Sequence, residues 1–217
     1  MLPTLVLLSQ FCTPSVLNKR RVQQPILHSF LPLIRPYLNS PIFKVRKLVA
    51  KVLAPLLDLP TLDLYVKTEI KAVESDSEFK ANKLHGVLLT LKYFLVLHRR
   101  LKRGVPSPCL ILLNSLISAL SRGEILRVFP IHTTLWDSFL IAIELSRIRC
   151  NSETVRKLRG TDGPDGINPL NVSEIEETVA KFVSWYELNA NVFRVVPCFD
   201  EALESAKRLL ALLNGNS

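Results

Sequence analysis

The chain has 217 residues, of which 48% are hydrophobic and 22% are charged. This composition excludes a disordered polypeptide, because it supplies enough apolar material for a packed core. No apolar run reaches the roughly 20 residues that a membrane-spanning helix requires, so we expect no membrane insertion.

The formal net charge is +9, and all of the positive excess lies in the first half of the chain. Residues 1–103 hold 17 Lys and Arg against 6 Asp and Glu, whereas residues 104–217 hold 11 against 13. A basic half suggests an anionic partner, RNA first, because neutralising phosphates gives an affinity that does not depend on sequence. The same charge also fits a solvated face that prevents self-association.

The first predicted helix spans Gln23 to Tyr37, and we expect Pro32 and Pro36 to bend it, because proline removes a backbone hydrogen bond. The clearest helix follows, from Ser40 to Leu56, with Ser40 as its N-cap and Pro41 at its first position. Its apolar residues recur every three or four positions and form one stripe, made of Val45, Leu48, Val49, Val52, Leu53 and Leu56. The opposite face carries Lys44, Lys47 and Lys51.

Helical periodicity continues to the end of the chain. Thr61 to Ala72 and Phe79 to Arg103 form the next predicted pair, and Gly104 suits the position just beyond the second of these helices. Ser173 and Glu176 match a capping box that begins a later helix. Further helices are expected over residues 107–123, 134–149 and 200–215, and only residues 192–199 are ambiguous.

Paired helices without strands predict an all-α protein, and we favour an α-solenoid of HEAT/armadillo-like helical pairs over a bundle. We expect helical pairs over residues 1–105, further helices over 106–160, a loop over 161–172 and a C-terminal helical pair over 173–217. The apolar start lacks the polar cap of a free-standing solenoid, so we expect a fragment or short isoform whose neighbour is the rest of a longer solenoid.

Residue patterns for catalysis are missing from the sequence. It contains no phosphate-binding glycine loop, no nucleophile elbow, no zinc-protease motif and no dinucleotide fingerprint. The four cysteines and four histidines show no metal-ligand spacing. We therefore predict a protein that is not an enzyme, with no cofactor and no metal site, and that acts through surfaces offered to partners.

Two basic clusters are candidate RNA-binding residues: Lys44, Arg46, Lys47 and Lys51 in one helix, and Arg99, Arg100, Lys102 and Arg103 at the end of another. Side chains three or four positions apart on a helix lie close enough to contact neighbouring phosphates. Either cluster also fits a solvated helix face. Asn82, His85 and Gly86 form a candidate structural motif, because a glycine within a helix is costly unless another element approaches closely.

Several segments resemble the THADA (thyroid adenoma-associated protein) family. These are the run from Leu5 to Gln10, Pro32-x-x-Arg35, the run from Ser40 to Leu57 and Asn82-Lys-Leu-His-Gly-Val-Leu-Leu89. The last is similar to that family's Asn-x-x-His-Gly-x-Leu-Leu helix, and the order and spacing of the motifs agree. The resemblance covers about residues 1–105, and the family's Arg-Arg-Ser-Ala-Gly-Leu-Pro signature is absent.

The resemblance implies a cytoplasmic α-solenoid that binds and orients tRNA for 2′-O-ribose methylation of the anticodon loop. In such a complex the partner is an FtsJ-type tRNA methyltransferase, which holds S-adenosylmethionine and the catalytic residues. The alternative function is an adaptor that binds other proteins independently of RNA.

Overall fold

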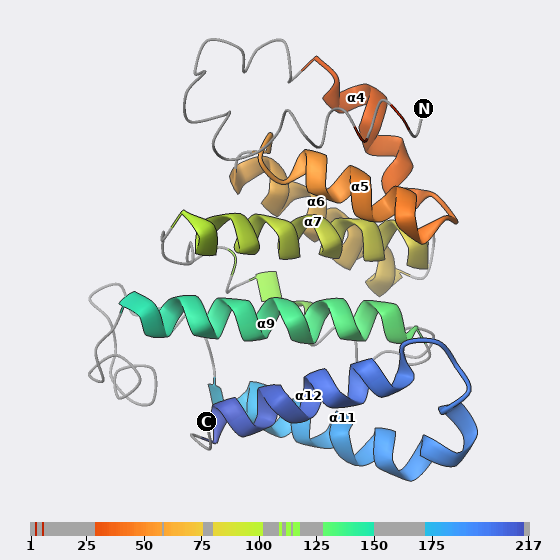
Figure 1. Cartoon of the computed structure of the whole chain (residues 1–217), viewed down its shortest axis with the longest axis vertical. Coiled ribbons are helices and arrows are strands. Elements are labelled where there is room, and N and C mark those ends of the chain that lie inside the picture. Colours follow the sequence, from red (N-terminus) through yellow and green to blue (C-terminus); the bar gives the residue numbers. More distant parts are fainter. Residues whose placement is uncertain are drawn as a thin grey trace. The chain divides into compact units, whose positions relative to one another are not determined.

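Figure 1 shows the chain as a computed structural model in which every described element is a helix. The structure describes residues 29–57, 59–75, 80–101, 128–149 and 172–214, together with residues 3, 6, 109, 112, 113 and 115–117. Two compact units divide the chain, one covering residues 1–103 and the other residues 104–217. The predicted all-α class is confirmed.

The first described elements are two short helices instead of one bent helix. α4 (Leu31–Ile34) is followed directly by the 3₁₀-helix η2 (Arg35–Asn39). Pro32 and Pro36 stand in the first turns of these two helices, where a missing backbone N–H is no loss. The prediction of one proline-bent helix is therefore wrong over residues 29–37, because each proline begins a helix; residues 23–28 lie outside the described residues.

The helix α5 (Phe43–Leu53) begins three residues after the predicted N-cap. Ser40 Oγ accepts a hydrogen bond from the backbone N–H of Ile42 at 3.2 Å, so Ser40 stabilises the turn before α5 instead of capping the helix. The predicted apolar stripe is buried at its centre, with Val49, Val52 and Leu53 at 0% exposure. The helix and its buried face were predicted correctly, and its start was not.

α7 (Ala81–Arg100) is the centre of the first unit, because α5, η2 and α6 (Leu59–Ser75) all pack against it. Figure 1 shows α5 and α6 alongside α7. The helix is buried without interruption from Leu84 to Leu91. A helix that is buried on several faces must pack against more than one element, and the 20-residue α7 packs against three.

The second unit contains α9 (Phe129–Arg149), α11 (Val172–Phe193) and α12 (Phe199–Leu213). α12 packs against both α9 and α11. α9 begins five residues before the predicted Thr134, with Pro130 in its first turn. The residues that join α11 to α12 form turns, so the ambiguous run 192–199 is not a strand.

The predicted capping box at Ser173 is wrong, because α11 begins at Val172 and Ser173 lies within the helix. Before α12, the only described non-glycine residue with a positive φ is Cys198, at 67°. Residues 109, 112, 113 and 115–117 are helical, inside the predicted helix 107–123. The predicted loop 161–172 lies almost entirely outside the described residues, and the domain boundaries stay predictions. Among the described residues, no helix is long and apolar enough to cross a bilayer.

Candidate nucleic-acid interface

The exposed lysines of α5 form the first part of the interface. Lys44, Lys47 and Lys51 are all exposed, and their spacing of three and four residues places them on one face of the helix. Among the described residues, none of them forms an ion pair with a carboxylate. We call these three residues the α5 lysine face. Its positive charge is therefore not neutralised by the described part of the first unit.

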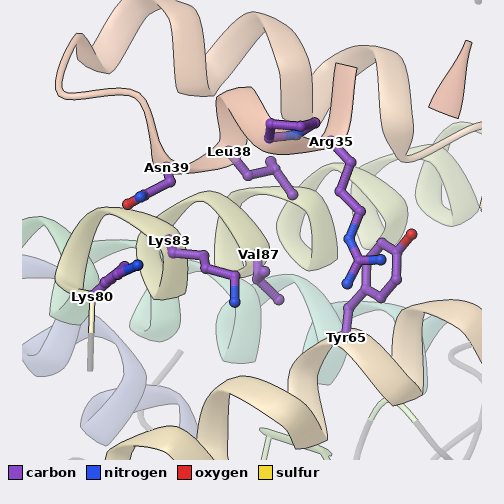
Figure 2. Close-up of a pocket in the computed structure, with 8 residues that line it drawn as sticks. Arg35, Leu38, Asn39, Tyr65, Lys80, Lys83 and Val87 are labelled. Atoms are coloured by element: carbon purple, nitrogen blue, oxygen red, sulfur yellow. The ribbon is translucent and has the colours of Figure 1, made fainter. Parts of the chain in front are cut away.

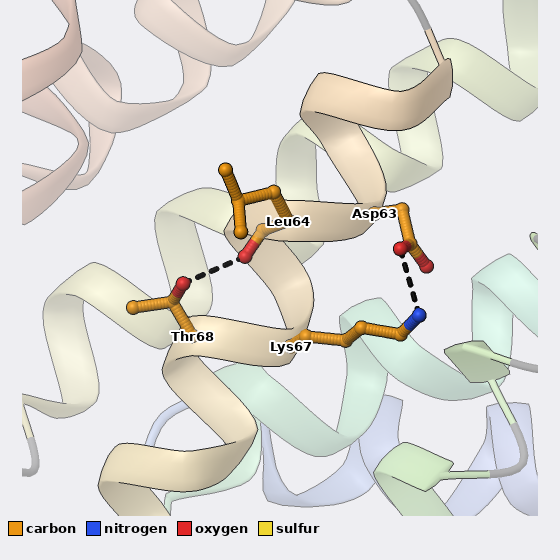
Figure 3. A network of polar contacts seen from close by, with 4 residues as sticks. All are labelled: Asp63, Leu64, Lys67 and Thr68. Atoms are coloured by element: carbon orange, nitrogen blue, oxygen red, sulfur yellow. Dashed lines mark hydrogen bonds and ion pairs between the residues drawn. The ribbon is translucent and has the colours of Figure 1, made fainter.

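Lysine on the neighbouring helix α6 is arranged differently. Lys67 Nζ lies 2.8 Å from Asp63 Oδ2 one turn earlier, and Thr68 Oγ1 donates a 2.7 Å hydrogen bond to the carbonyl of Leu64 (Figure 3). These contacts stay within α6 and are what a solvated helix face makes. Lys67 is thus locally neutralised, in contrast to the α5 lysine face.

The sequence places Arg46 in the same basic cluster as these lysines, yet in the structure it is buried on another side of α5. Only 6% of its surface is exposed. Its Nη1 donates hydrogen bonds to the carbonyls of Ser40 at 2.6 Å and Pro41 at 3.2 Å, while its Nε is buried without a partner. Burial lowers the pKa of Arg46 from its ordinary value. The guanidinium therefore fixes the turn before α5 and does not belong to the α5 lysine face.

The other terminal nitrogen of this guanidinium, Nη2, contacts His85. Its Nδ1 lies 3.2 Å from Arg46 Nη2, and the Phe43 ring stacks on the imidazole with centroids 5.6 Å apart and planes 4° apart. Burial, together with the nearby charges of Arg46 and Lys92, lowers the pKa of His85 to about 4. The ring is neutral at pH 7, so Nδ1 can accept the hydrogen bond from Arg46. This pair joins α5 to α7.

Gly86, the next residue, allows η2 to approach α7. A Cβ at this position would lie 2.3 Å from the carbonyl oxygen of Leu38 and 2.9 Å from both its carbonyl carbon and its Cβ. No side chain fits at such distances. Asn82 is exposed one turn before His85. The residues of the candidate structural motif therefore occupy different environments: two lie in the junction of η2, α5 and α7, and one faces solvent.

The second basic cluster is only partly described. Arg99 and Arg100 are exposed in the last turn of α7, where cations interact favourably with the negative end of the helix dipole. Lys102 and Arg103 lie outside the described residues.

A basic cavity that no sequence motif predicts lies between η2, α6 and α7 (Figure 2). It has a volume of about 350 Å³. Its polar lining comes from Arg35, Asn39, Tyr65, Lys80 and Lys83, and Leu38 and Val87 add apolar surface. Of these residues, Arg35, Lys83 and Val87 lie within the sequence motifs. The others come from elements far apart in the chain, so no local pattern could have brought them together.

The buried polar groups of the second unit are structural. Tyr186 Oη forms a hydrogen bond with His132 Nδ1 and accepts one from Trp136 Nε1 at 3.4 Å. All three side chains are at 0% exposure, and aromatic rings surround them. Burial raises the pKa of Tyr186 above its ordinary value, so its hydroxyl stays protonated. No group of His, Cys, Asp and Glu in the described parts of either unit could hold a metal ion.

Comparison with known proteins identifies a similar family for the first part of the chain. Neither the curated proteins nor the solved structures contain a significant match to this chain. Residues 1–94 match the family model described as Trm732, C-terminal TPR repeats. The matched segment contains the α5 lysine face, the basic cavity and the Arg46–His85 pair. The first 94 residues are thus similar to the C-terminal TPR repeats of Trm732.

Proposed function

We propose that the chain is a non-catalytic scaffold that helps to bind and orient tRNA for 2′-O-ribose methylation of the anticodon loop. An FtsJ-type methyltransferase is the proposed partner and supplies S-adenosylmethionine and the catalytic residues. Two similarities support the proposal: the match of residues 1–94 to the Trm732 repeats, and the motifs shared with the THADA family. On this proposal the repeats are HEAT-like and the protein is cytoplasmic.

The observation that carries the proposal is the α5 lysine face within the matched segment. Its three ammonium groups are exposed and have no described carboxylate partner, so they are available to phosphates. Successive side chains on one helix face have Cβ atoms about 5–6 Å apart, which suits contact with neighbouring phosphates of one strand. Each phosphate contact releases about one counterion and steepens the salt dependence of binding. Arg99 and Arg100 extend the proposed surface. Arg46 contributes indirectly, because its hydrogen bonds fix the turn before α5.

Salt dependence of tRNA binding tests the proposal. The test variant carries Lys44→Gln, Lys47→Gln and Lys51→Gln. The matched control carries Lys67→Gln, Lys181→Gln and Lys207→Gln, which remove the same formal charge from lysines that already pair with carboxylates at 2.8, 2.7 and 2.7 Å. We expect the slope of log Kobs against log salt to shrink by roughly 2–3 in the test variant, since each phosphate-contacting lysine contributes about 1.

The control should change that slope by less than about 1, because its lysines make no phosphate contact on this proposal. Equal slopes for the wild type and the test variant would remove the α5 lysine face from the interface. Circular dichroism on all three proteins verifies that the helices remain.

A second candidate function is an RNA-independent adaptor, and exposed apolar residues near the end of α11 favour it. Leu188 and Val192 are 84% and 65% exposed one turn apart, and Val195 in the following turn is 90% exposed. Exposed apolar residues gathered in one place indicate a protein contact more often than scattered ones do. This function would be favoured by a protein partner that stays bound after RNase treatment. The partner should also bind the variant with Lys44→Gln, Lys47→Gln and Lys51→Gln, here called the α5 lysine variant, as tightly as it binds the wild type.

A further inference from the structure

The basic cavity between η2, α6 and α7 has the lining of an anion site. Arg35 comes from η2, while Lys80 precedes α7 and Lys83 lies in its first turn. The cavity is lined by three cationic side chains and, among the described residues, by no carboxylate. Cationic side chains gathered in a concave surface raise the positive electrostatic potential there, and this potential attracts anions.

Arg35 is held in a geometry that suits a phosphate. Its guanidinium carbon lies 3.8 Å from the centroid of the Tyr65 ring, and Figure 2 shows the side chain extending from η2 across to α6. Stacking on an aromatic ring fixes the plane of a guanidinium and leaves its N–H edge able to donate two parallel hydrogen bonds. Planar, two-pronged donation is what recognises the oxygens of a phosphate.

The cations are spread along the cavity. Figure 2 shows Lys80 and Asn39 at one end, Arg35 and Tyr65 at the other, and Lys83 between them. The positive end of the α7 helix dipole lies at the Lys80 end, and the first turn of α7 contains no acidic residue. This distribution suits an elongated anion with a charge at each end more than a single compact ion. A volume of about 350 Å³ is at the small end of the range for ligand pockets, near the size of one nucleotide.

We propose that this cavity binds one nucleotide of a single-stranded RNA segment, with Arg35 holding the phosphate at one end and Lys80 and Lys83 the phosphate at the other. Asn39 lines the same end of the cavity as Lys80 and can donate or accept hydrogen bonds at the sugar or base. The choice of RNA as the ligand rests on the proposed function. The cavity adds a concave, shaped contact to the exposed α5 lysine face, because it can select unpaired nucleotides that enter it and exclude a rigid duplex.

The direct test uses small RNA probes and the full chain. The probes are the 5′-phosphorylated dinucleotide pUpU and inorganic phosphate, and binding is measured by isothermal titration calorimetry. The test variant carries Lys80→Gln and Lys83→Gln. The control carries Lys67→Gln and Lys71→Gln, two exposed lysines of α6 outside the cavity lining, so both variants lose two charges. Arg35→Gln is a second test variant that alters the opposite end of the cavity.

We expect pUpU to bind the wild type and the control equally, and each test variant at least tenfold more weakly, because the loss of a hydrogen bond to a charged group weakens binding by at least that factor. Inorganic phosphate should bind the wild type at least tenfold more weakly than pUpU. Equal pUpU affinity for the test variants and the control would overturn the assignment. Phosphate binding as tight as pUpU would also overturn it, since the cavity would then be a general anion site.

The same proteins separate this inference from the proposed function. If tRNA binding depends on the α5 lysine face but pUpU does not bind the cavity, the cavity assignment is wrong and the proposed function stands. If pUpU binds the cavity as expected but tRNA binding is absent or ignores the α5 lysine face, the proposed function is wrong and the nucleotide site stands.

Discussion

Replacing Gly86 with alanine tests whether the close approach of η2 to α7 holds the first unit together. The new Cβ would meet the carbonyl oxygen of Leu38 at 2.3 Å, roughly 1 Å inside an ordinary contact. Because that oxygen belongs to the backbone, no rotamer change relieves the clash, and η2 must move away from α7. Leu38 and Ile34, each 3% exposed, would lose part of their packing as it moves.

Two opposing effects set the magnitude. Alanine in a helix interior is about 0.8–1 kcal/mol more favourable than glycine, so substitution alone would stabilise α7. Forcing an extra group into a packed contact costs about 1–3 kcal/mol, and the carbonyl contact at 2.3 Å places this site at the upper end. We expect a net destabilisation of about 1–2 kcal/mol, which for a unit of this size lowers the melting temperature by about 4–16 °C.

Thermal and urea unfolding followed by circular dichroism at 222 nm measures the effect. Asn82→Ala is the matched control, because Asn82 is exposed on the same helix and gains only helix propensity. Its stability should equal or slightly exceed that of the wild type. If Gly86→Ala were as stable as Asn82→Ala, η2 would not lie as close to α7 as the structure places it, and the account of this junction would be refuted.

Three further predictions concern buried polar groups. The folded-state pKa of His85, about 4, is below its ordinary value of 6.5, so the unfolded chain takes up the proton at a higher pH than the folded chain does. The contribution of His85 to the free energy of unfolding should therefore be fully present above pH 6.5, and the free energy should fall by up to about 3 kcal/mol as the pH drops towards 4. His85→Asn, which keeps an acceptor for Arg46 but does not titrate, should flatten that urea-midpoint profile between pH 4 and 6.5, and an unchanged profile would assign it to other groups. Arg46→Met should lower the free energy of unfolding in urea by about 1.5–3 kcal/mol, because the carbonyls of Ser40 and Pro41 lose a charged donor. The exposed control Lys47→Met should change this free energy by less than about 0.5 kcal/mol, and equal effects would contradict the burial of Arg46. Tyr186→Phe should destabilise the second unit by about 1–3 kcal/mol by removing the partner of Trp136 Nε1, and a neutral result would show that water or another group replaces the hydroxyl.

The positions of the helices followed from the sequence, while their starts depended on contacts that the sequence does not display. The stripe through Val49, Val52 and Leu53 predicted α5 correctly because burial of a helix face leaves a period of 3.6 residues. Residue type alone predicts helix caps at Ser40 and Ser173. The structure uses Ser40 in the preceding turn and places Ser173 inside α11, since many residues that can cap a helix do not do so.

For Arg46, the helical spacing indicated a buried position, but its charge indicated an exposed one. It lies three, four and seven residues before Val49, Ala50 and Leu53, so the helical period places it on the buried stripe. Its charge outweighed that spacing in the prediction, because an arginine is seldom buried unless it is paired. The pairing comes from His85, 39 residues away, and from carbonyls in the turn before α5. The basic cavity could not be predicted for the same reason: Arg35, Tyr65 and Lys80 meet only when η2, α6 and α7 have packed.

The measurement that tests the central claim most directly is the mapping of ribose methylation in tRNA from cells that lack this protein. The cells are rescued with the wild type, with the α5 lysine variant or with the matched control that alters Lys67, Lys181 and Lys207. We predict that 2′-O-methylation of the anticodon loop is lost on depletion, returns with the wild type and the control, and stays low with the α5 lysine variant. Normal methylation in the depleted cells would contradict a role in tRNA methylation, and full rescue by the α5 lysine variant would contradict a role for that face.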